Sequence, residues 1–169
     1  MGNRDEVWNA AWETFYDTYY HVILFEMLSK RWQTLDFLTK LLVTITTSSS
    51  AVAGWALWND NDYKIVWLVL AGFASFISII HTTLNVNEKV KKYSDLSNKM
   101  SSVKYDFESF QHEMKVYPDF DVKDFYNKLE LLRNKNINIL ENHSIDFLTT
   151  DKIRNKAQDK LNLALNIEG

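Results

Sequence analysis

The most apolar stretch of the chain covers residues 65–84. It reads IVWLVLAGFASFISIIHTTL and contains no Asp, Glu, Lys or Arg. A helix of this length, at about 1.5 Å of rise per residue, reaches roughly the 30 Å thickness of a bilayer's hydrocarbon core. The pattern predicts a membrane-spanning helix, and the alternative is the buried central helix of a soluble bundle.

A second apolar stretch precedes it at residues 37–58, where Lys40 is the one charged residue. The segment 59–62, Asn-Asp-Asn-Asp, separates the two stretches and is short enough to force an antiparallel hairpin. Aromatic residues gather around this turn, as at a membrane–water interface. The expected fold is a hairpin with spans at about 37–58 and 63–86, with both termini on the cytoplasmic side because lysines and arginines flank the outer ends of the spans.

The regions outside this hairpin also have helical periodicity. Residues 1–36 form an amphipathic helix with an aromatic face, and no glycine or proline separates it from residue 37 onward, so one very long helix is expected. Residues 121–142 and the segment after residue 150 predict two further helices. The fold class is therefore all-α: a two-span transmembrane hairpin at 37–86, with residues 1–36 and 87–169 forming a cytoplasmic helical bundle.

The clearest heptad repeat occurs within residues 86–117. Large apolar residues recur at alternating steps of three and four, which is typical of a coiled-coil seam. This seam packs either within the chain's own bundle or between subunits of a homo-oligomer. Its residues are Tyr93, Leu96, Met100, Val103, Phe107, Phe110 and Met114.

Composition supports a helical fold and narrows the function. With one proline and four glycines, the chain has little turn-forming material, and a sheet is not expected. The mean hydropathy of −0.27 averages over strongly segregated segments. A net charge of −3 argues against bulk affinity for nucleic acid, and the absence of cysteine excludes disulfides and thiolate sites.

No motif of an enzyme is present. The four histidines are dispersed, and no phosphate-binding glycine loop or paired carboxylate site occurs, so neither catalysis, a metal nor a cofactor is expected. His81 and Asn85, near the end of the second predicted span, are candidates for gating. Lys89, Lys91 and Lys92 follow and would contact lipid headgroups, or the phosphate of a nucleotide or oligonucleotide signal.

Hydroxyl and small side chains cluster in the first predicted span. Their two interpretations are tight packing within the hairpin and, on oligomerisation, the lining of a pore. The lining candidates are Thr44, Thr47, Ser48, Ala51 and Gly54. Asp60 and Asp62 would then supply negative charge at the outer mouth.

The order of an aromatic first helix, the stretch Ser48 to Trp55, a short polar turn, a second apolar span and a long heptad helix resembles the SLATT family. The resemblance covers roughly residues 5–117. It implies a bacterial inner-membrane protein of an anti-phage defence system, which oligomerises into a gated pore on a signal from a nucleotide or a cognate sensor protein. The alternative is a membrane-anchored helical scaffold that docks a cytoplasmic partner and conducts nothing.

Overall fold

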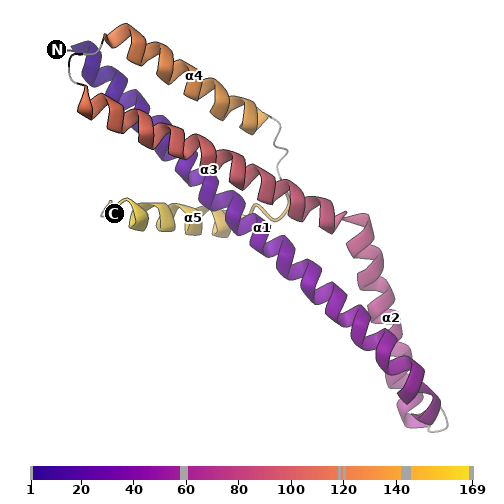
Figure 1. Cartoon of the computed structure of the whole chain (residues 1–169). Coiled ribbons are helices and arrows are strands. Elements are labelled where there is room, and N and C mark those ends of the chain that lie inside the picture. The colour runs from indigo at the N-terminus through magenta and orange to yellow at the C-terminus, as the bar shows by residue number, and fades with distance from the viewer. Residues whose placement is uncertain (1, 58–60, 118, 120, 142–145, 168–169) are drawn as a thin grey trace. The chain divides into compact units, whose positions relative to one another are not determined.

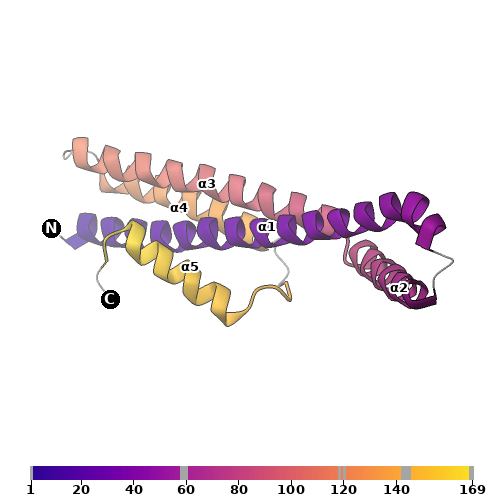
Figure 2. The same ribbon diagram turned by 90° about the horizontal axis from the view of Figure 1, so that it is seen from below.

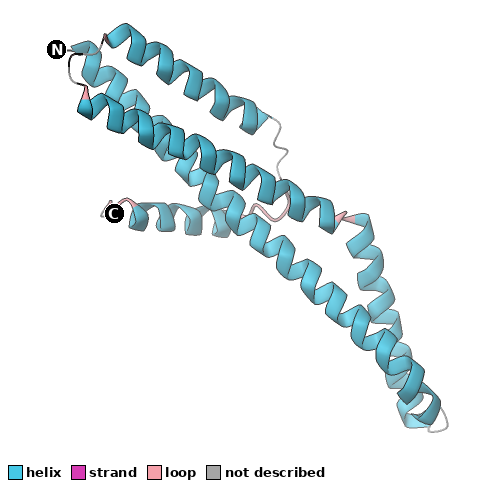
Figure 3. Ribbon diagram, viewed as in Figure 1, coloured by secondary structure: helices cyan, strands magenta, loops and turns pink. Residues whose placement is uncertain are grey.

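A computed structural model describes residues 2–57, 61–117, 119, 121–141 and 146–167. Within these ranges the side chains at 2, 3, 45–57, 61–64, 66, 67, 70 and 71 are left undescribed. All elements in the described ranges are helices (Figures 1 and 3), so the all-α prediction is confirmed. They are α1 (Gly2–Leu57), α2 (Asn61–Thr83), α3 (Val86–Val116), α4 (Val122–Glu141) and α5 (Asp151–Ala164).

The helices belong to two compact units. We call residues 1–28 with 92–169 the bundle unit, and residues 29–91 the hairpin unit. α1 supplies its first half to the bundle unit and its second half to the hairpin unit.

The transmembrane prediction does not hold for the residues described. Nowhere in the described ranges is a helix both long enough and apolar enough to cross a membrane. The predicted two-span hairpin and the inner-membrane localisation are therefore wrong for these residues, and the pore and channel interpretation loses its structural basis. Polar residues stand within both predicted spans: α2 carries Ser75, Ser78 and His81 among its apolar residues, and α1 carries Lys40 and Thr44.

In the bundle unit, α1 and α3 pack antiparallel along their length (Figures 1 and 2). Near the start of α1, Arg4 donates hydrogen bonds to the carbonyls of Met114 and, at 3.4 Å, Tyr117. Further along, the ring centroids of Phe25 and Tyr93 are 6.2 Å apart. Residue numbers thus rise along α1 as they fall along α3, and the aromatic face of α1 is covered by the heptad face of α3.

α4 completes one core with these two helices. Phe110 and Phe125 meet edge to face with centroids 5.8 Å apart. The core unites residues from three segments: Val7, Ala11 and Phe15 of α1; Val103, Phe107, Phe110 and Met114 of α3; and Phe125, Leu129 and Leu132 of α4.

Polar contacts fix the direction of α4. Arg133 Nε donates to Thr14 Oγ1 at 3.2 Å, and Asn136 Nδ2 donates to Asp17 Oδ2 at 3.3 Å, so α4 runs parallel to α1. Ion pairs of Lys128 with Glu113 and of Lys135 with Asp106 make it antiparallel to α3.

α5 packs against α1 with both apolar and polar side chains. Ile153, Ala157 and Leu161 form its buried stripe. Beside them, the Tyr16 hydroxyl donates to Asn162 Oδ1 at 3.0 Å. The amphipathic spacing of α5 therefore buries three apolar side chains and still satisfies its polar edge.

In the hairpin unit, α2 is joined to α1 by a polar contact. His81 Nε2 lies 3.0 Å from Asp36 Oδ1, and the same carboxylate accepts from Lys40 Nζ at 2.7 Å. α2 then passes to α3 through a short turn in which Asn85 has a φ of 49°, a left-handed conformation that asparagine tolerates better than most residues.

The shared core of the bundle unit predicts a strong effect of removing one central ring. Phe107→Ala should lower the free energy of unfolding by about 3–5 kcal/mol, because the ring is fully buried and leaves a cavity. Chemical denaturation followed by circular dichroism measures this. The matched control is Tyr105→Ala, two residues away and 64% exposed, which should change stability by less than about 0.5 kcal/mol. Equal losses from both would contradict the assigned core.

Candidate functional site

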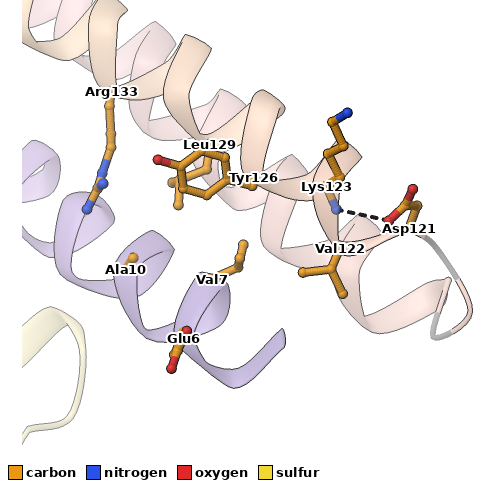
Figure 4. A pocket seen from close by; sticks show the side chains of 9 residues that line it. All are labelled: Glu6, Val7, Ala10, Asp121, Val122, Lys123, Tyr126, Leu129 and Arg133. Carbon is orange, nitrogen blue, oxygen red and sulfur yellow. Dashed lines mark hydrogen bonds between the residues drawn. The ribbon is translucent and has the colours of Figure 1, made fainter. Parts of the chain in front are cut away.

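A concavity of the bundle unit lies between the N-terminal parts of α1 and of α4. It has a volume of about 660 Å³, within the range of about 300–1,000 Å³ common for ligand sites. We call it the α1–α4 groove (Figure 4). It is lined by Glu6, Val7, Ala10, Asp121, Val122, Lys123, Tyr126, Leu129 and Arg133.

The floor of the groove follows from helical spacing. On α4, Val122, Tyr126 and Leu129 fall at steps of four and three, so they share one face with Arg133 four residues on. Leu129 is buried in the core, whereas Tyr126 is 51% exposed and lies over the floor in Figure 4. Val7 and Ala10 supply the facing wall, and the result is an apolar trough with one half-exposed aromatic ring.

The rim of the groove carries both signs of charge. Arg133 reaches from α4 toward α1, where its Nε donates to Thr14 and its Nη1 lies 3.3 Å from Glu130 Oε1. Lys123 follows Val122 by one residue, about 100° around the helix, and is exposed at the other end of the groove, while Glu6 is exposed on the α1 side. The α4 rim therefore carries the two cations Lys123 and Arg133 together with the carboxylate of Asp121, and the α1 rim is acidic.

The end of the groove at the α4 N-terminus is rigidly built. Asp121 accepts the backbone N–H of Lys123 at 3.1 Å through Oδ1, and its carbonyl accepts the N–H groups of Asp124 and Phe125. This is the geometry of an N-cap residue, which satisfies backbone donors in the first turn. The start of α4 is thus fixed before any ligand arrives.

Arg4 holds the corresponding end of α1 in place. Besides its bonds to the last carbonyls of α3, its guanidinium carbon lies 5.6 Å from the centroid of the Phe125 ring. A cation at a helix C-terminus is favourable for the helix dipole and for the unpaired carbonyls there. One side chain therefore ties the first turn of α1 to both α3 and α4.

The nine lining residues of the groove include no histidine, serine, threonine or cysteine. Across the described residues, no three His, Asp or Glu side chains gather into a metal site. The chemistry that the groove offers is apolar contact bordered by fixed charge.

The predicted packing residues lie in the interior of the bundle unit. All members of the heptad set, Tyr93 to Met114, are buried, and Val103, Phe107, Phe110 and Met114 belong to the core shared with α1 and α4. For Tyr93, burial raises the pKa of the phenol, and nearby Asp146 raises it further. Of the two interpretations of the heptad, the structure shows packing within the chain.

Of the five candidates for lining a pore, only Thr44 has a side chain among the described residues. Thr44 is exposed, and its hydroxyl donates to the carbonyl of Lys40 at 2.7 Å in its own helix. The side chains of Thr47, Ser48, Ala51, Gly54 and Asp62, and residue Asp60 altogether, lie outside the described residues.

The remaining candidates fall near the junction of α2 and α3. His81 contacts Asp36, and Asn85 forms the turn, which gives both a structural part in the hairpin unit. Lys89 and Lys91 belong to the hairpin unit, and Lys92 belongs to the bundle unit, where its Nζ lies 6.0 Å from the Tyr93 ring. The trio as a lipid or phosphate site stays a prediction.

Comparisons with family models, with curated proteins and with solved structures found no match to this chain. The resemblance to the SLATT family, and the defence context that it implies, therefore stays a prediction.

A titratable pair lies on α1 beyond the residues that line the groove. His21 Nδ1 is 3.4 Å from Asp17 Oδ1, and the His21 hydrogen bond holds the pKa of Asp17 below its usual value. Burial alone would lower the pKa of His21, but its hydrogen bonds to Asp17 and the charge of that carboxylate outweigh burial and raise it above 6.5. The stabilisation from His21 is present below pH 6.5 and is lost as pH rises through its raised pKa. The stabilisation from ionised Asp17 is lost as pH falls through the lowered pKa of this carboxyl group.

Asp17→Asn should therefore lower the pKa of His21, because burial remains while the anionic partner is gone. Titration of the His21 ring by NMR measures this directly. The stability difference between wild type and variant should be largest between the lowered pKa of Asp17 and the raised pKa of His21, and should shrink on either side. An unchanged His21 titration in the variant would show that the pair does not interact.

Proposed function

We propose that the protein is a non-enzymatic helical scaffold whose α1–α4 groove docks an amphipathic helix of a partner protein. The observation that supports this is the groove itself: a cavity of about 660 Å³ with an apolar floor, open on one side and framed by charge. A helix laid in such a trough would bury residues at i, i+3, i+4 and i+7 against Val7, Ala10 and Leu129.

Charge around the groove specifies the partner further. Lys123 and Arg133 border the α4 side, and Glu6 borders the α1 side. A docking helix therefore carries acidic residues on the edge that faces α4 and basic residues on the edge that faces α1. Such complementarity orients the partner and selects it against helices of the opposite pattern.

This proposal keeps the docking part of the scaffold alternative and leaves out the membrane anchor. A pore would have needed the spanning helices that the described residues do not provide. Docking needs a rigid receptor instead, and Arg4 and the Asp121 cap supply rigidity at the two helix ends that form the groove.

Site-specific photo-crosslinking tests the proposal. A benzoylphenylalanine introduced at Tyr126, in the groove, should capture one protein of defined mass in the native cells. Mass spectrometry should locate the adduct on an amphipathic helix with acidic residues on one edge. The same probe at Tyr105, which is exposed on α3 and outside the groove, is the matched control.

Filling the groove provides the decisive comparison. Ala10→Trp, placed in the wall, should abolish the Tyr126 adduct, whereas Ala164→Trp, exposed on α5, should leave it unchanged. An adduct that survives Ala10→Trp, or that also forms from Tyr105, would refute docking in this groove.

A further inference from the structure

One face of α2 in the hairpin unit exposes an unusual set of large apolar side chains. Each is between 56% and 69% exposed: Ile65, Leu68, Val69, Phe73, Phe76 and Ile79. No Asp, Glu, Lys or Arg occurs between residues 65 and 87, so the face carries no formal charge.

The exposed face has the spacing of a helix-pairing seam. Ile65, Val69, Gly72, Phe76 and Ile79 follow one another at alternating steps of four and three, which is the pattern of the core positions of a coiled coil. The opposite face of α2 is the one that meets α1, because His81 there contacts Asp36. The seam is thus a second packing face with no partner helix on it among the described residues.

The size of this face matches a protein interface. If each of the six side chains exposes somewhat more than half of ~200 Å², the face amounts to on the order of 700 Å², close to the ~800 Å² that each partner buries in a standard complex. The largest apolar patch on a typical monomer is only about 300–600 Å². An area this large is expected to be covered.

Gly72 gives a separate indication of close approach. A Cβ added at this position would meet nothing within 4 Å, so no contact with the described part of the chain requires a glycine. Glycine within a helix is less favourable than alanine by about 0.8–1.0 kcal/mol. At the centre of the seam, it would allow the backbone of another helix to come close.

We propose that α2 pairs antiparallel with α2 of a second copy of this chain, the two helices crossing at Gly72. The seam is complementary to itself in this orientation. With Gly72 facing Gly72, Ile65 faces Ile79, and Val69 lies within one residue of the level of Phe76, so apolar residues meet apolar residues on both sides of a two-fold axis. An uncharged face of this area takes an apolar partner, and the second copy provides one of the same size.

Self-association through α2 goes beyond the docking function and is independent of it. The α1–α4 groove lies in the bundle unit, and the seam lies in the hairpin unit. Loss of either activity can therefore be measured without loss of the other.

Cysteine crosslinking tests the geometry, because the natural chain has no cysteine. Gly72→Cys in the purified full chain should form a disulfide-linked dimer under mild oxidation. Ile65→Cys and Ile79→Cys should each stay uncrosslinked alone and form a dimer when mixed. In an antiparallel pair, two copies of Ile65 lie about 21 Å apart along the axis, too far for the roughly 7 Å Cα separation that a disulfide allows. Self-crosslinking of Ile65→Cys would show a parallel pair and overturn the proposal.

Sedimentation of uncrosslinked variants tests the driving force. Gly72→Leu should weaken dimerisation at least about tenfold by holding the two backbones apart, with the monomer still helical because a Cβ at this position meets no described atom within 4 Å and leucine is a good helix former. Ser78→Leu adds the same side chain at an exposed position of α2 away from the seam and should leave dimerisation unchanged. A monomeric wild type, a Gly72→Leu variant that dimerises normally, or uptake onto phosphatidylcholine vesicles in place of self-association would each overturn the proposal.

Discussion

The antiparallel contact of α1 with α3 is the interaction on which the rest of the bundle unit depends. Phe15 and Phe107 lie in the same buried cluster, and α4 adds Phe125 and Leu129 to a surface that these two helices already form. Because the aromatic face of α1 and the heptad of α3 are both continuous, the pair offers a long template. The α1–α4 groove exists because α4 leaves part of that template open beside Val7 and Ala10.

Apolar burial and polar contacts have different parts in this arrangement. The ion pairs of Lys128 with Glu113 and of Lys135 with Asp106 are partly or largely exposed, and exposed pairs contribute little to stability. They fix instead the direction and register of α4, which a layer of phenylalanines would leave less well defined. Arg4 combines both parts, since it pairs with the carbonyls of α3 and stacks on Phe125.

Periodicity predicted the elements better than their partners. The heptad from Tyr93 to Met114 could be identified because a buried helical face repeats in the sequence, and the long first helix because nothing interrupts it. The groove could not be predicted from the sequence, because bringing Val7 and Leu129 together depends on how two helices far apart in the sequence pack. Its one local signal was the face shared by Val122, Tyr126, Leu129 and Arg133. The uncharged run at 65–84 was predicted to span a membrane, but no helix among the described residues is both long enough and apolar enough to do so.

The contacts that close the bundle unit have a consequence for the order of folding. Arg4 meets Met114, 110 positions later, and Tyr16 meets Asn162, 146 positions later, whereas Asp36 and His81 are only 45 apart. During synthesis from the N-terminus, the hairpin unit can close first. The apolar face of the first half of α1 stays exposed until α3 has emerged from the ribosome. Long-range closure of this kind is slow and exposes aggregation-prone surface in the meantime. The nascent chain therefore has its greatest need of a chaperone before residue 114 emerges.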